Sequence, residues 1–523
     1  MANTLKFGAG QWATKEGSTL AYNDENDNYK PLPFTFTRAS NATVVNKAGL
    51  IETVGNGIPR IDFLGNTQGA LKLEPQRTNL ITYSSDFPNP YWTKSGATIQ
   101  GDPSTAGSEL IVNGDFATDS DWIKGTGWTI SGGKASCDGS NSALDQFSIT
   151  TIGKTYKVDI TVTDMTTASV NVRLGTGSSD IIGSITSNGT YTFYGTVASN
   201  TAFRIRSSAG FDGSVDNVSV KEVQGFTSPD GTTNAYKLVE NSANSSHYLR
   251  VNASNANPSV ISVFAKKGEE TKIFIGNATF SQGVLFDLDL GVIESGSDGT
   301  IENYGNGWYK CSFYRTDLNS WQYISLRGNF TTYQGNGVNG VYLYGAQLEE
   351  GSYATSYIPT QGSAVTRLAD TASGSGNADT FNDSEGTLYF EGSALENGGG
   401  SNRFISLSDG TSDNLIYIRI DSTASRFRGF ARGSSGSYTL VTVNSIPQTD
   451  NNKIALVWDA TNFRIWINGS ERDTTTINDL PIGMNTLSLT DPTGSSPFFG
   501  KVKQLQVYNT ALTDQELQAL TQV

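Results

Sequence analysis

The sequence has few residues of the kinds that build redox, metal or catalytic centres. Its 523 residues include only two cysteines, Cys137 and Cys311, and one histidine, His247. Two cysteines in separate parts of the chain offer neither a disulfide framework nor a thiolate zinc site. One histidine excludes a histidine-rich metal centre. We therefore interpret both cysteines as strand residues.

Long apolar segments and basic clusters are absent as well. No stretch approaches the ~20 apolar residues that a membrane-spanning helix needs, and the opening residues MANTLKFGAGQWATKEG lack the apolar segment of a secretory signal. We therefore expect neither secretion nor membrane insertion, and a protein made in a cytoplasm. The 50 acidic and 36 basic residues give a formal net charge of -14, which argues against nucleic acid as a partner.

What the sequence has in quantity is glycine and short alternating segments. Glycine supplies 57 residues against 14 prolines, a composition typical of short strands joined by glycine-bearing turns. The chain is several times longer than the usual domain of ~100 to 150 residues, which predicts about three or four folding units. We therefore predict an all-β protein of tandem β-sandwich or jelly-roll modules.

The N-terminal region is predicted to hold two small elements. Residues 1–33 are polar and rich in turn-forming residues, so we expect an extended segment that cannot fold alone. Its aromatic residues Phe7, Trp12 and Tyr22 would then need a surface supplied by another protein. From residue 34 the pattern changes to short alternating strands, and residues 34–87 are predicted to form a small β collar.

An internal repeat organises the middle of the chain. Segments 110–223 and 226–358 carry similar landmarks in the same order, for example NGTYTFY in the first and NGWYKCSFY in the second. The second copy lacks an opening strand of its own, and we place that strand upstream in YWTKSGATI. This predicts a jelly roll made of residues 88–104 and 225–365, with a second jelly roll, residues 105–224, inserted into it.

The last module is predicted to span residues 366–523. A linker rich in Gly, Ser and Asn precedes strands such as NLIYIRI and FRIWING, whose strict alternation is typical of half-buried antiparallel strands. The closing stretch TDQELQALT places Thr513 and Glu516 at the spacing of a helix-capping box. A short helix is therefore expected at the end of the module.

Two stretches of this module carry a family resemblance. They are NKIALVWDATNFRIWINGS (452–470) and GKVKQLQVYNTALTDQELQAL (500–520), and they resemble the concanavalin A-like, laminin-G-like lectin and glucanase superfamily. The inserted copy is similar to galactose-binding-like jelly rolls of the carbohydrate-binding-module type, through NGDF, GWT and DNVSV. These resemblances imply sandwich modules of the glycan-binding type.

Other stretches extend the resemblance over nearly the whole chain. The stretches LKLEPQRTNLITYSSDF, GWYKCSF and AQLEEGSYATSYIPT are similar to segments of structural fibre proteins of tailed bacteriophages, including the crAss-like phages of gut Bacteroidales. The resemblance implies a fibre on the virion surface, synthesised in the host bacterial cytoplasm and attached by its N-terminus to other virion proteins. A head fibre is slightly favoured over a tail fibre. Such fibres are commonly homotrimers, although no heptad pattern is visible here.

The same resemblance suggests one metal site. In carbohydrate-binding modules, hard oxygen ligands from an N-terminal loop and from the last strand often hold calcium, and Asp115 and Asp216 match those positions. The alternative is that Asp216 makes a turn bond with Asn217 ahead of the final strand. No other cofactor is expected.

A glycan-binding face is predicted in the last module from strand parity. Ile416, Ile418 and Ile420 share one face, which leaves Tyr417 and Arg419 on the other. The same parity separates Arg464 and Trp466 from Phe463 and Ile465, and Arg426 and Arg428 bracket Phe427. A face of arginine and aromatic side chains on an acidic protein suits an acidic host polysaccharide. The alternative is that this face packs on a neighbouring subunit or module.

Catalysis is not expected. The Glu-x-Asp-x-x-Glu strand of laminarinase-like enzymes is absent, and glycoside hydrolysis needs two carboxylates flanking one bond. Ser245, Ser246 and His247 are adjacent in a polar loop, whereas a triad converges from separate elements, so we interpret His247 as a surface residue. A polysaccharide depolymerase and a free carbohydrate-binding protein remain the alternatives to a non-enzymatic fibre.

Overall fold

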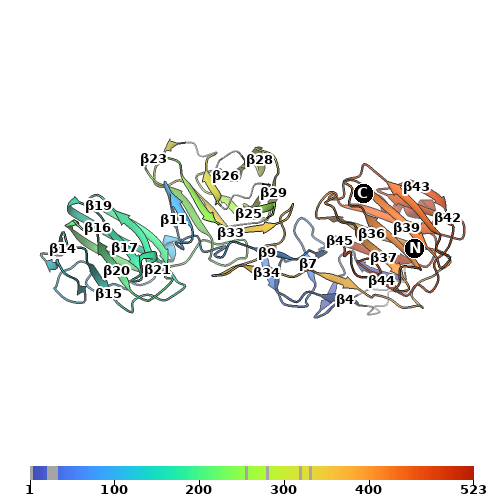
Figure 1. The fold of residues 1–523 in the computed structure, drawn as a ribbon, viewed down its shortest axis with the longest axis horizontal. Helices are drawn as coiled ribbons and strands as arrows, with labels where there is room; N and C mark the ends of the chain where they lie inside the picture. The colour runs from blue at the N-terminus through green and yellow to red at the C-terminus, as the bar shows by residue number, and fades with distance from the viewer. Residues whose placement is uncertain (1–3, 21–32, 254–256, 278–281, 317–320, 329–331) are drawn as a thin grey trace. The chain divides into compact units, whose positions relative to one another are not determined.

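The computed structural model describes residues 4–20, 33–253, 257–277, 282–316, 321–328 and 332–523. Regular structure there is almost entirely β-strand, and the only α-helix in the described ranges is α1 (Asp514–Thr521). The all-β prediction is confirmed. The chain forms two compact units, of which the first comprises Met1–Thr78, Glu350–Ile358 and Thr366–Val523 and the second Asn79–Glu349 and Pro359–Val365 (Figure 1). No helix of the described part is long and apolar enough to cross a membrane.

The second unit contains one sandwich made of two five-stranded sheets, drawn in green and cyan in Figure 1. Along β16, the side chains of Tyr156, Val158, Ile160 and Val162 are buried while those between them are not. This two-residue period places one face of the sheet on the core. The strand orders are β13 (Trp128–Ser131), β14 (Lys134–Asp138), β21 (Asp212–Val223), β16 (Thr155–Thr167), β19 (Gly189–Thr196); and β12 (Ile123–Lys124), β15 (Ala143–Gln146), β20 (Phe203–Ser207), β17 (Val170–Leu174), β18 (Ile181–Ile185).

The second unit also contains a sandwich of two six-stranded sheets. Two of its strands precede the first sandwich in the chain: β10 pairs with β24, and β11 pairs with β22 with Ala97 opposite Glu240. The chain thus leaves this sandwich after Gln100 and re-enters it at Tyr236. The strand orders are β10 (Thr93–Ser95), β24 (Tyr248–Asn252), β31 (Trp321–Leu326), β26 (Lys272–Asn277), β27 (Gly283–Asp287), β28 (Val292–Ser295); and β11 (Ala97–Gln100), β22 (Tyr236–Glu240), β33 (Gly340–Glu350), β25 (Ser259–Lys267), β30 (Trp308–Arg315), β29 (Gly299–Asn303).

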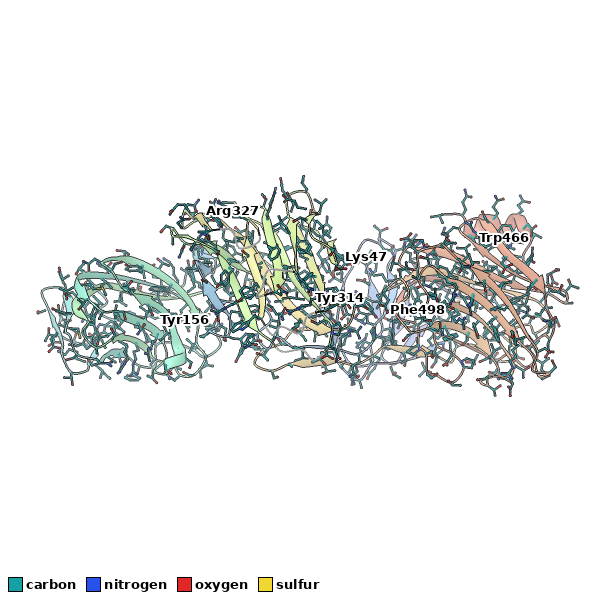
Figure 2. The ribbon with its side chains drawn as sticks, turned by 45° about the horizontal axis from the view of Figure 1, so that its top comes forward. Lys47, Tyr156, Tyr314, Arg327, Trp466 and Phe498 are labelled. Carbon is teal, nitrogen blue, oxygen red and sulfur yellow. The ribbon has the colours of Figure 1, made fainter. Side chains whose placement is uncertain are left out.

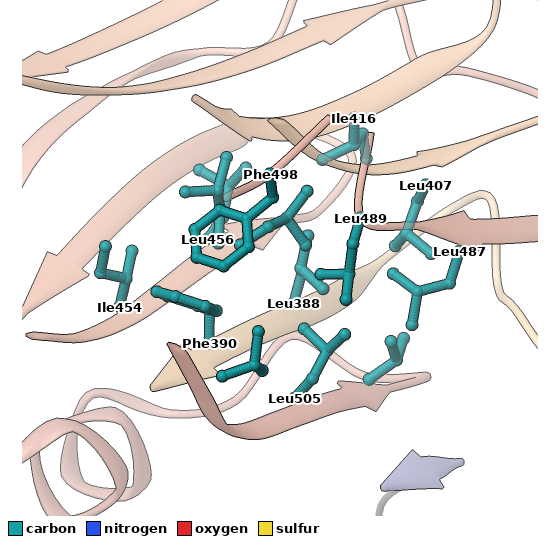
Figure 3. Packing of buried hydrophobic residues seen from close by; sticks show 14 of the residues in the cluster. Leu388, Phe390, Leu407, Ile416, Ile454, Leu456, Leu487, Leu489, Phe498 and Leu505 are labelled. Atoms are coloured by element: carbon teal, nitrogen blue, oxygen red, sulfur yellow. The ribbon is translucent and has the colours of Figure 1, made fainter. Parts of the chain in front are cut away.

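The first unit is built on an eight-stranded and a five-stranded sheet that face each other. Their apolar faces meet in one core, which includes Leu388 and Leu456 of one sheet, Ile416 of the other, and Phe498 (Figure 3). The larger sheet has the order β43 (Ser470–Thr476), β42 (Asn462–Ile467), β41 (Asn452–Trp458), β36 (Gly386–Ala394), β45 (Gly500–Tyr508), β8 (Ala70–Leu73), β7 (Arg60–Asp62), and β1 (Leu5–Gly8) also pairs with β45; the smaller has the order β40 (Tyr438–Val443), β39 (Phe427–Arg432), β38 (Leu415–Ile420), β37 (Arg403–Ser408), β44 (Thr486–Ser488).

Short elements complete the two units. A four-stranded sheet, β2-β3-β4-β35, and the hairpin β5-β6 belong to the first unit, and the pair β23-β32 belongs to the second. The bounds are β2 (Ala13–Lys15), β3 (Ser18–Leu20), β4 (Phe34–Thr37), β5 (Ala42–Val45), β6 (Ile51–Val54), β9 (Arg77–Asn79), β23 (Asn244–Ser245), β32 (Tyr333–Gln334), β34 (Val365–Arg367), β35 (Thr371–Ser373), and the 3-10 helices η1 (Pro103–Thr105) and η2 (Ser178–Asp180).

The N-terminal residues belong to the C-terminal sandwich, which corrects the expectation of a separate extended segment. Strand β1 pairs antiparallel with β45, and Leu5 and Phe7 are buried in the shared core. Their alternation matches the inward face of β45, so they need no surface from another protein. Gly8 has a φ of +91°, and a Cβ there would lie 1.9 Å from the carbonyl oxygen of Lys503. The close approach of β1 to β45 therefore requires glycine at this position.

The expected anchor and collar change accordingly. Phe7 is 1% exposed, so it cannot serve as a docking residue while β1 is in place. Trp12 is half-buried against the same core, and Tyr22 lies outside the described residues. The region 34–87 is not a separate collar, because β7 and β8 extend the eight-stranded sheet and β4 pairs with β35. Strand β7 and strand β45 can be followed in Figure 1.

A buried ion network joins the early and late segments of the first unit. Arg60 donates to Glu74 (Nη1 to Oε2, 2.7 Å) and to Asp370. Arg38 Nη1 lies 3.0 Å from Asp370 Oδ1, and Arg367 Nη1 lies 2.9 Å from Glu74 Oε2. All five side chains are almost completely buried. Burial alone would raise the pKa of Glu74, but the charges of Arg367, Lys72 and Arg60 hold that pKa well below its usual value.

Candidate functional site

The candidate site is the outer face of the five-stranded sheet of the first unit. On β38, Ile416, Ile418 and Ile420 point into the core, so Tyr417 and Arg419 lie on the opposite face. Register extends this face to β39, because Tyr417 is directly opposite Phe430 and Arg419 is directly opposite Arg428. The structure therefore brings together Tyr417, Arg419 and Arg428, as strand parity predicted.

Aromatic rings form a row across four strands of this face. Tyr417 and Phe430 are stacked, with ring centroids 4.8 Å apart and planes inclined by 7°. Phe430 is stacked on Tyr438 at 5.7 Å, and Phe404 meets Tyr417 edge-on at 5.0 Å. Rings that stack on one another offer mainly their edges to a ligand. Tyr438, on β40 at the end of the row, is 63% exposed and offers a free ring face.

Beside the aromatic row, three arginines share one carboxylate. Asp421 lies just beyond β38 with its side chain 1% exposed. Its Oδ2 accepts from Arg419 Nη2 at 2.8 Å, and its Oδ1 accepts from Arg426 Nη2 at 2.6 Å. Arg428 Nε forms a longer ion pair with Oδ2, at 3.4 Å. Burial alone would raise the pKa of Asp421, but the bond from Arg426 and the charges of Arg419 and Arg428 lower it to about 2.

The cluster has three positive side chains and one negative side chain, and the excess of positive charge does not stabilise the sheet. Arg419 and Arg428 lie directly opposite each other on neighbouring strands, an arrangement of like charges that destabilises a sheet by roughly 0.2–1 kcal/mol. Burial and the neighbouring Arg419 lower the pKa of Arg428. One carboxylate cannot neutralise three guanidinium groups, and each of these side chains is between 18% and 26% exposed. The surplus charge is therefore accessible to an anionic ligand.

The other two predicted glycan-binding residues lie on a different sheet. Trp466 and Arg464 are on β42, whose outer face is covered by helix α1. Trp466 (labelled in Figure 2) is 8% exposed and packs with Leu512 and Leu517. Arg464 Nη1 donates to Asp514 Oδ1 at 2.6 Å, at the start of the helix. Strand parity identified the face correctly but not the helix that covers it, so Trp466 is a packing residue and not a platform for a sugar ring.

Sequence reasoning missed four members of the outer face. Phe404, Phe430 and Tyr438 follow the same parity as Tyr417 and could have been found by extending the alternation to β37, β39 and β40. Asp421 gives no such signal, because its role depends on arginines from two strands and the loop between them.

The residues proposed for calcium make local hydrogen bonds in this structure. Asp216 accepts from the backbone N of Asn217 at 2.6 Å and from its side-chain amide at 3.1 Å, which is the turn bond considered as the alternative. Asp115 is exposed, and its Oδ1 accepts from the backbone N of Ala117 at 3.3 Å. Across the described ranges no three His, Cys, Asp or Glu side chains gather into a group that could hold a metal. The turn bond is present, and calcium binding by Asp115 and Asp216 stays a prediction.

His247 is buried, which corrects its interpretation as a surface residue. It is 1% exposed; its Nδ1 contacts the carbonyl oxygen of Gly96, and its Nε2 lies 3.2 Å from that of Tyr333. Both ring nitrogens thus face backbone oxygens, and the imidazole joins the turn between β10 and β11 to β32. The free cysteines Cys137 and Cys311 are also buried, and burial raises the pKa of the Cys311 thiol well above its usual value.

Several solved structures are similar to parts of this chain. The CBM40 of Ruminococcus gnavus IT-sialidase bound to α2,3-sialyllactose is 20% identical, with 29% of this chain and 94% of that chain covered and a TM-score of 0.25. The NanB sialidase from Streptococcus pneumoniae is 19% identical, with 28% of this chain and 25% of that chain covered and a TM-score of 0.25. The botulinum neurotoxin type G receptor binding domain is 15% identical, with 29% of this chain and 38% of that chain covered and a TM-score of 0.23.

A family match is found in the C-terminal region. No curated protein matches the chain. Residues 369–518 match the family model described as the concanavalin A-like lectin/glucanases superfamily. The match coincides with the sandwich that carries the outer face, and it confirms the resemblance inferred for this module. The C-terminal sandwich thus has a concanavalin A-like fold.

Proposed function

We propose that the C-terminal sandwich binds acidic glycans on the outer face of its five-stranded sheet. The observation that carries the proposal is the cluster of Arg419, Arg426 and Arg428 around a single buried carboxylate, Asp421. The chain as a whole has a formal net charge of -14, so this surplus of positive charge is a local departure. Guanidinium groups bind carboxylates and sulfates through paired hydrogen bonds.

The distance between Tyr438 and the arginine cluster sets the minimum length of a ligand that contacts both. Tyr438 offers an exposed ring face for stacking on a sugar, and Arg432 lies directly opposite it on β39. Thr442, opposite Arg428, lies four residues from Tyr438 along β40, which corresponds to ~13 Å at ~3.3 Å per residue. A ligand that contacts both Tyr438 and the arginine cluster therefore contains more than one sugar unit.

A matched pair of oligosaccharides tests the proposal. Trigalacturonate and its fully methyl-esterified form have the same sugar chain, but only the first has free carboxylates. Binding of each to the full chain can be measured by isothermal titration calorimetry. We expect the charged form alone to bind, with an affinity that falls as salt is added. Arg428→Gln should weaken this binding about tenfold, and Tyr438→Ala should weaken it as well. Lys47→Gln, on the β5–β6 hairpin of the same unit, removes one positive charge elsewhere and should leave it unchanged.

Two results would contradict glycan binding at this face. Equal binding of the charged and esterified forms would exclude the arginine cluster as the reason for recognition. Equal losses in Arg428→Gln and Lys47→Gln would show that general charge, and not this cluster, attracts the polymer.

We also propose that the chain is a structural fibre of a bacteriophage virion, a head fibre in preference to a tail fibre. Support comes from the resemblance of LKLEPQRTNLITYSSDF and AQLEEGSYATSYIPT to such fibres. The proposal includes attachment through the N-terminal region, a trimeric assembly and binding to host surface glycans without hydrolysis. Since Phe7 is in the core, attachment would use other residues of that region. Tracing the chain in images of whole particles, and assaying glycan cleavage by new reducing ends, would test these points.

A further inference from the structure

The outer face of the five-stranded sheet is divided into three steps along β39 and β40. Arg428, Phe430 and Arg432 alternate with buried residues on β39, so all three lie on the outer face. They span ~13 Å at ~3.3 Å per residue. Register pairs each of them with a residue of β40. We name the pairs the arginine step (Arg428 with Thr442), the apolar step (Phe430 with Leu440) and the tyrosine step (Arg432 with Tyr438).

The arginine step has room for one negative charge from a ligand. Arg428 meets Asp421 through Nε, at 3.4 Å, and its side chain is 25% exposed. This contact leaves both Nη groups of Arg428 to a ligand. Asp473 reaches the edge of the step, where it accepts from a backbone N of β40 at 2.7 Å. With Arg419 and Arg426, three guanidinium groups face two carboxylates, so one ligand carboxylate balances the charge.

The apolar step gives a carboxylate no charged partner. Phe430 stacks on Tyr417, which lies directly opposite it on β38, and Leu440 is 40% exposed. A carboxylate placed on this surface would lose water without gaining an ion pair, which is unfavourable. An uncharged sugar unit instead places its C–H groups against these side chains.

At the tyrosine step the arginine already has a partner. Arg432 Nη2 lies 3.4 Å from Asp413 Oδ1, and Arg432 Nη1 donates to the carbonyl oxygen of Ser412 at 3.0 Å. The Asp413 side chain is 71% exposed, so its negative charge acts on any ligand at this end. Tyr438 is 63% exposed and can stack on a sugar ring. The step therefore favours an uncharged sugar unit over an acidic one.

We infer that the outer face recognises a glycan whose acidic unit lies at the arginine step and whose neighbouring units, over the apolar and tyrosine steps, are uncharged. The substrate class is a heteropolysaccharide in which uncharged units separate the acidic ones, in preference to a homopolymer of uronic acid. The inference rests on the acidic-glycan binding proposed for this face.

Forms of trigalacturonate with a single free carboxylate test the inference. Methyl esters block the other two carboxylates, so the free acid lies on the first, the middle or the last unit. Binding of each monoacid and of the triacid to the full chain is measured by isothermal titration calorimetry. We expect one terminal monoacid to bind at least as tightly as the triacid. The middle monoacid should bind several-fold more weakly than that terminal one, because it cannot fill both the apolar and the tyrosine step.

Asp413→Asn changes the charge of the tyrosine step alone. The change frees Arg432 for a ligand carboxylate, so we expect the ratio of triacid affinity to terminal-monoacid affinity to rise several-fold. Glu52→Gln, on the β5–β6 hairpin of the same unit, removes one negative charge elsewhere and should leave that ratio unchanged.

The outcomes separate this inference from the function on which it rests. The inference is overturned if the triacid binds more tightly than every monoacid, or if Asp413→Asn shifts the ratio no more than Glu52→Gln does. In both cases acidic glycans still bind, so the function proposed for this face stands. If neither the triacid nor any monoacid binds, the proposed function fails, and the inference fails with it.

Discussion

The first unit has two arginine clusters, which contain similar residues but differ in how deeply the arginines are buried. In the ion network of Arg38, Arg60, Arg367, Glu74 and Asp370, every side chain is within 1% of complete burial. In the outer-face cluster, only Asp421 is buried, and its three arginines are partly exposed. The network contains two carboxylates, and the outer face contains one.

The difference separates an arginine that holds a fold from one that is available to a ligand. In the network, backbone acceptors complete the bonding: Arg38 donates to the carbonyl oxygens of Gly55 and Ile58, and Arg60 to that of Thr43. Removing one partner there leaves buried charge without compensation. On the outer face, water can solvate the arginine charge that Asp421 does not neutralise. Losing one of these arginines therefore changes the free energy of unfolding only a little. Burial of the cation, more than its pairing, distinguishes the two roles.

The largest effect is expected from Asp370→Asn. This change leaves Arg38 and Arg60 buried beside a neutral amide, and we expect the first unit to lose about 3–5 kcal/mol of unfolding free energy. Urea unfolding followed by tryptophan fluorescence measures the loss, with Lys47→Gln as the surface control. A loss no greater than that of the control would mean that the network contributes little to stability.

A smaller loss is expected from Asp421→Asn. The three arginines around it reach solvent, so the uncompensated charge is partly hydrated, and we expect a loss of about 1–3 kcal/mol in the same unfolding experiment. The comparison of the two clusters fails if this variant is destabilised as strongly as Asp370→Asn.

Acidification should reduce the contribution of Asp421 in a defined window. Its pKa is about 2 in the folded chain and about 4 when unfolded, so its ionised form favours folding. That contribution is complete above pH ~4 and is lost as the pH falls towards ~2. The difference in stability between wild type and Asp421→Asn should therefore be constant near neutral pH and shrink below pH ~4. A difference that grows on acidification would contradict the assigned pKa shift.

The smallest effect, of opposite sign, is expected from Arg428→Gln. The change removes a like charge directly across from Arg419, and we expect unfolding free energy to rise by about 0.2–1 kcal/mol, in the same variant that weakens acidic glycans. Thermal unfolding without ligand is the measurement. If the variant is destabilised, Arg428 belongs with the structural arginines and the surplus-charge argument fails.

Local sequence patterns correctly predicted the features that depend on neighbouring residues, namely the faces of the strands and the start of the helix. Alternation separated Ile416 and Ile418 from Tyr417 and Arg419, and the capping box of Thr513 and Glu516 begins helix α1 as expected. The same parity could not show that α1 covers Trp466, because parity assigns a face and says nothing of what packs on it. Whether an aromatic side chain is a binding platform or a packing residue is decided by that second layer.

Contacts between distant segments gave no signal in the sequence. Arg60 and Asp370 are separated by 310 positions, and Glu74 and Asp370 by 296. Each is an ordinary charged residue in its own segment. Likewise, the alternation of Leu5 and Phe7 does not reveal that their partner strand is β45. Without the pairing, the aromatic residues of this polar segment are interpreted as needing a surface from another protein.

The pairing of β1 with β45 also constrains the order in which the chain can assemble. The register places Leu5 opposite Val507, so β1 must wait until β45 has been synthesised. At ~5 to 20 residues per second, that delay is on the order of half a minute or more. During this time Leu5 and Phe7 have no partner strand, and the sheet edge that will receive them does not yet exist. Closure of the eight-stranded sheet therefore cannot occur before β45 has been synthesised.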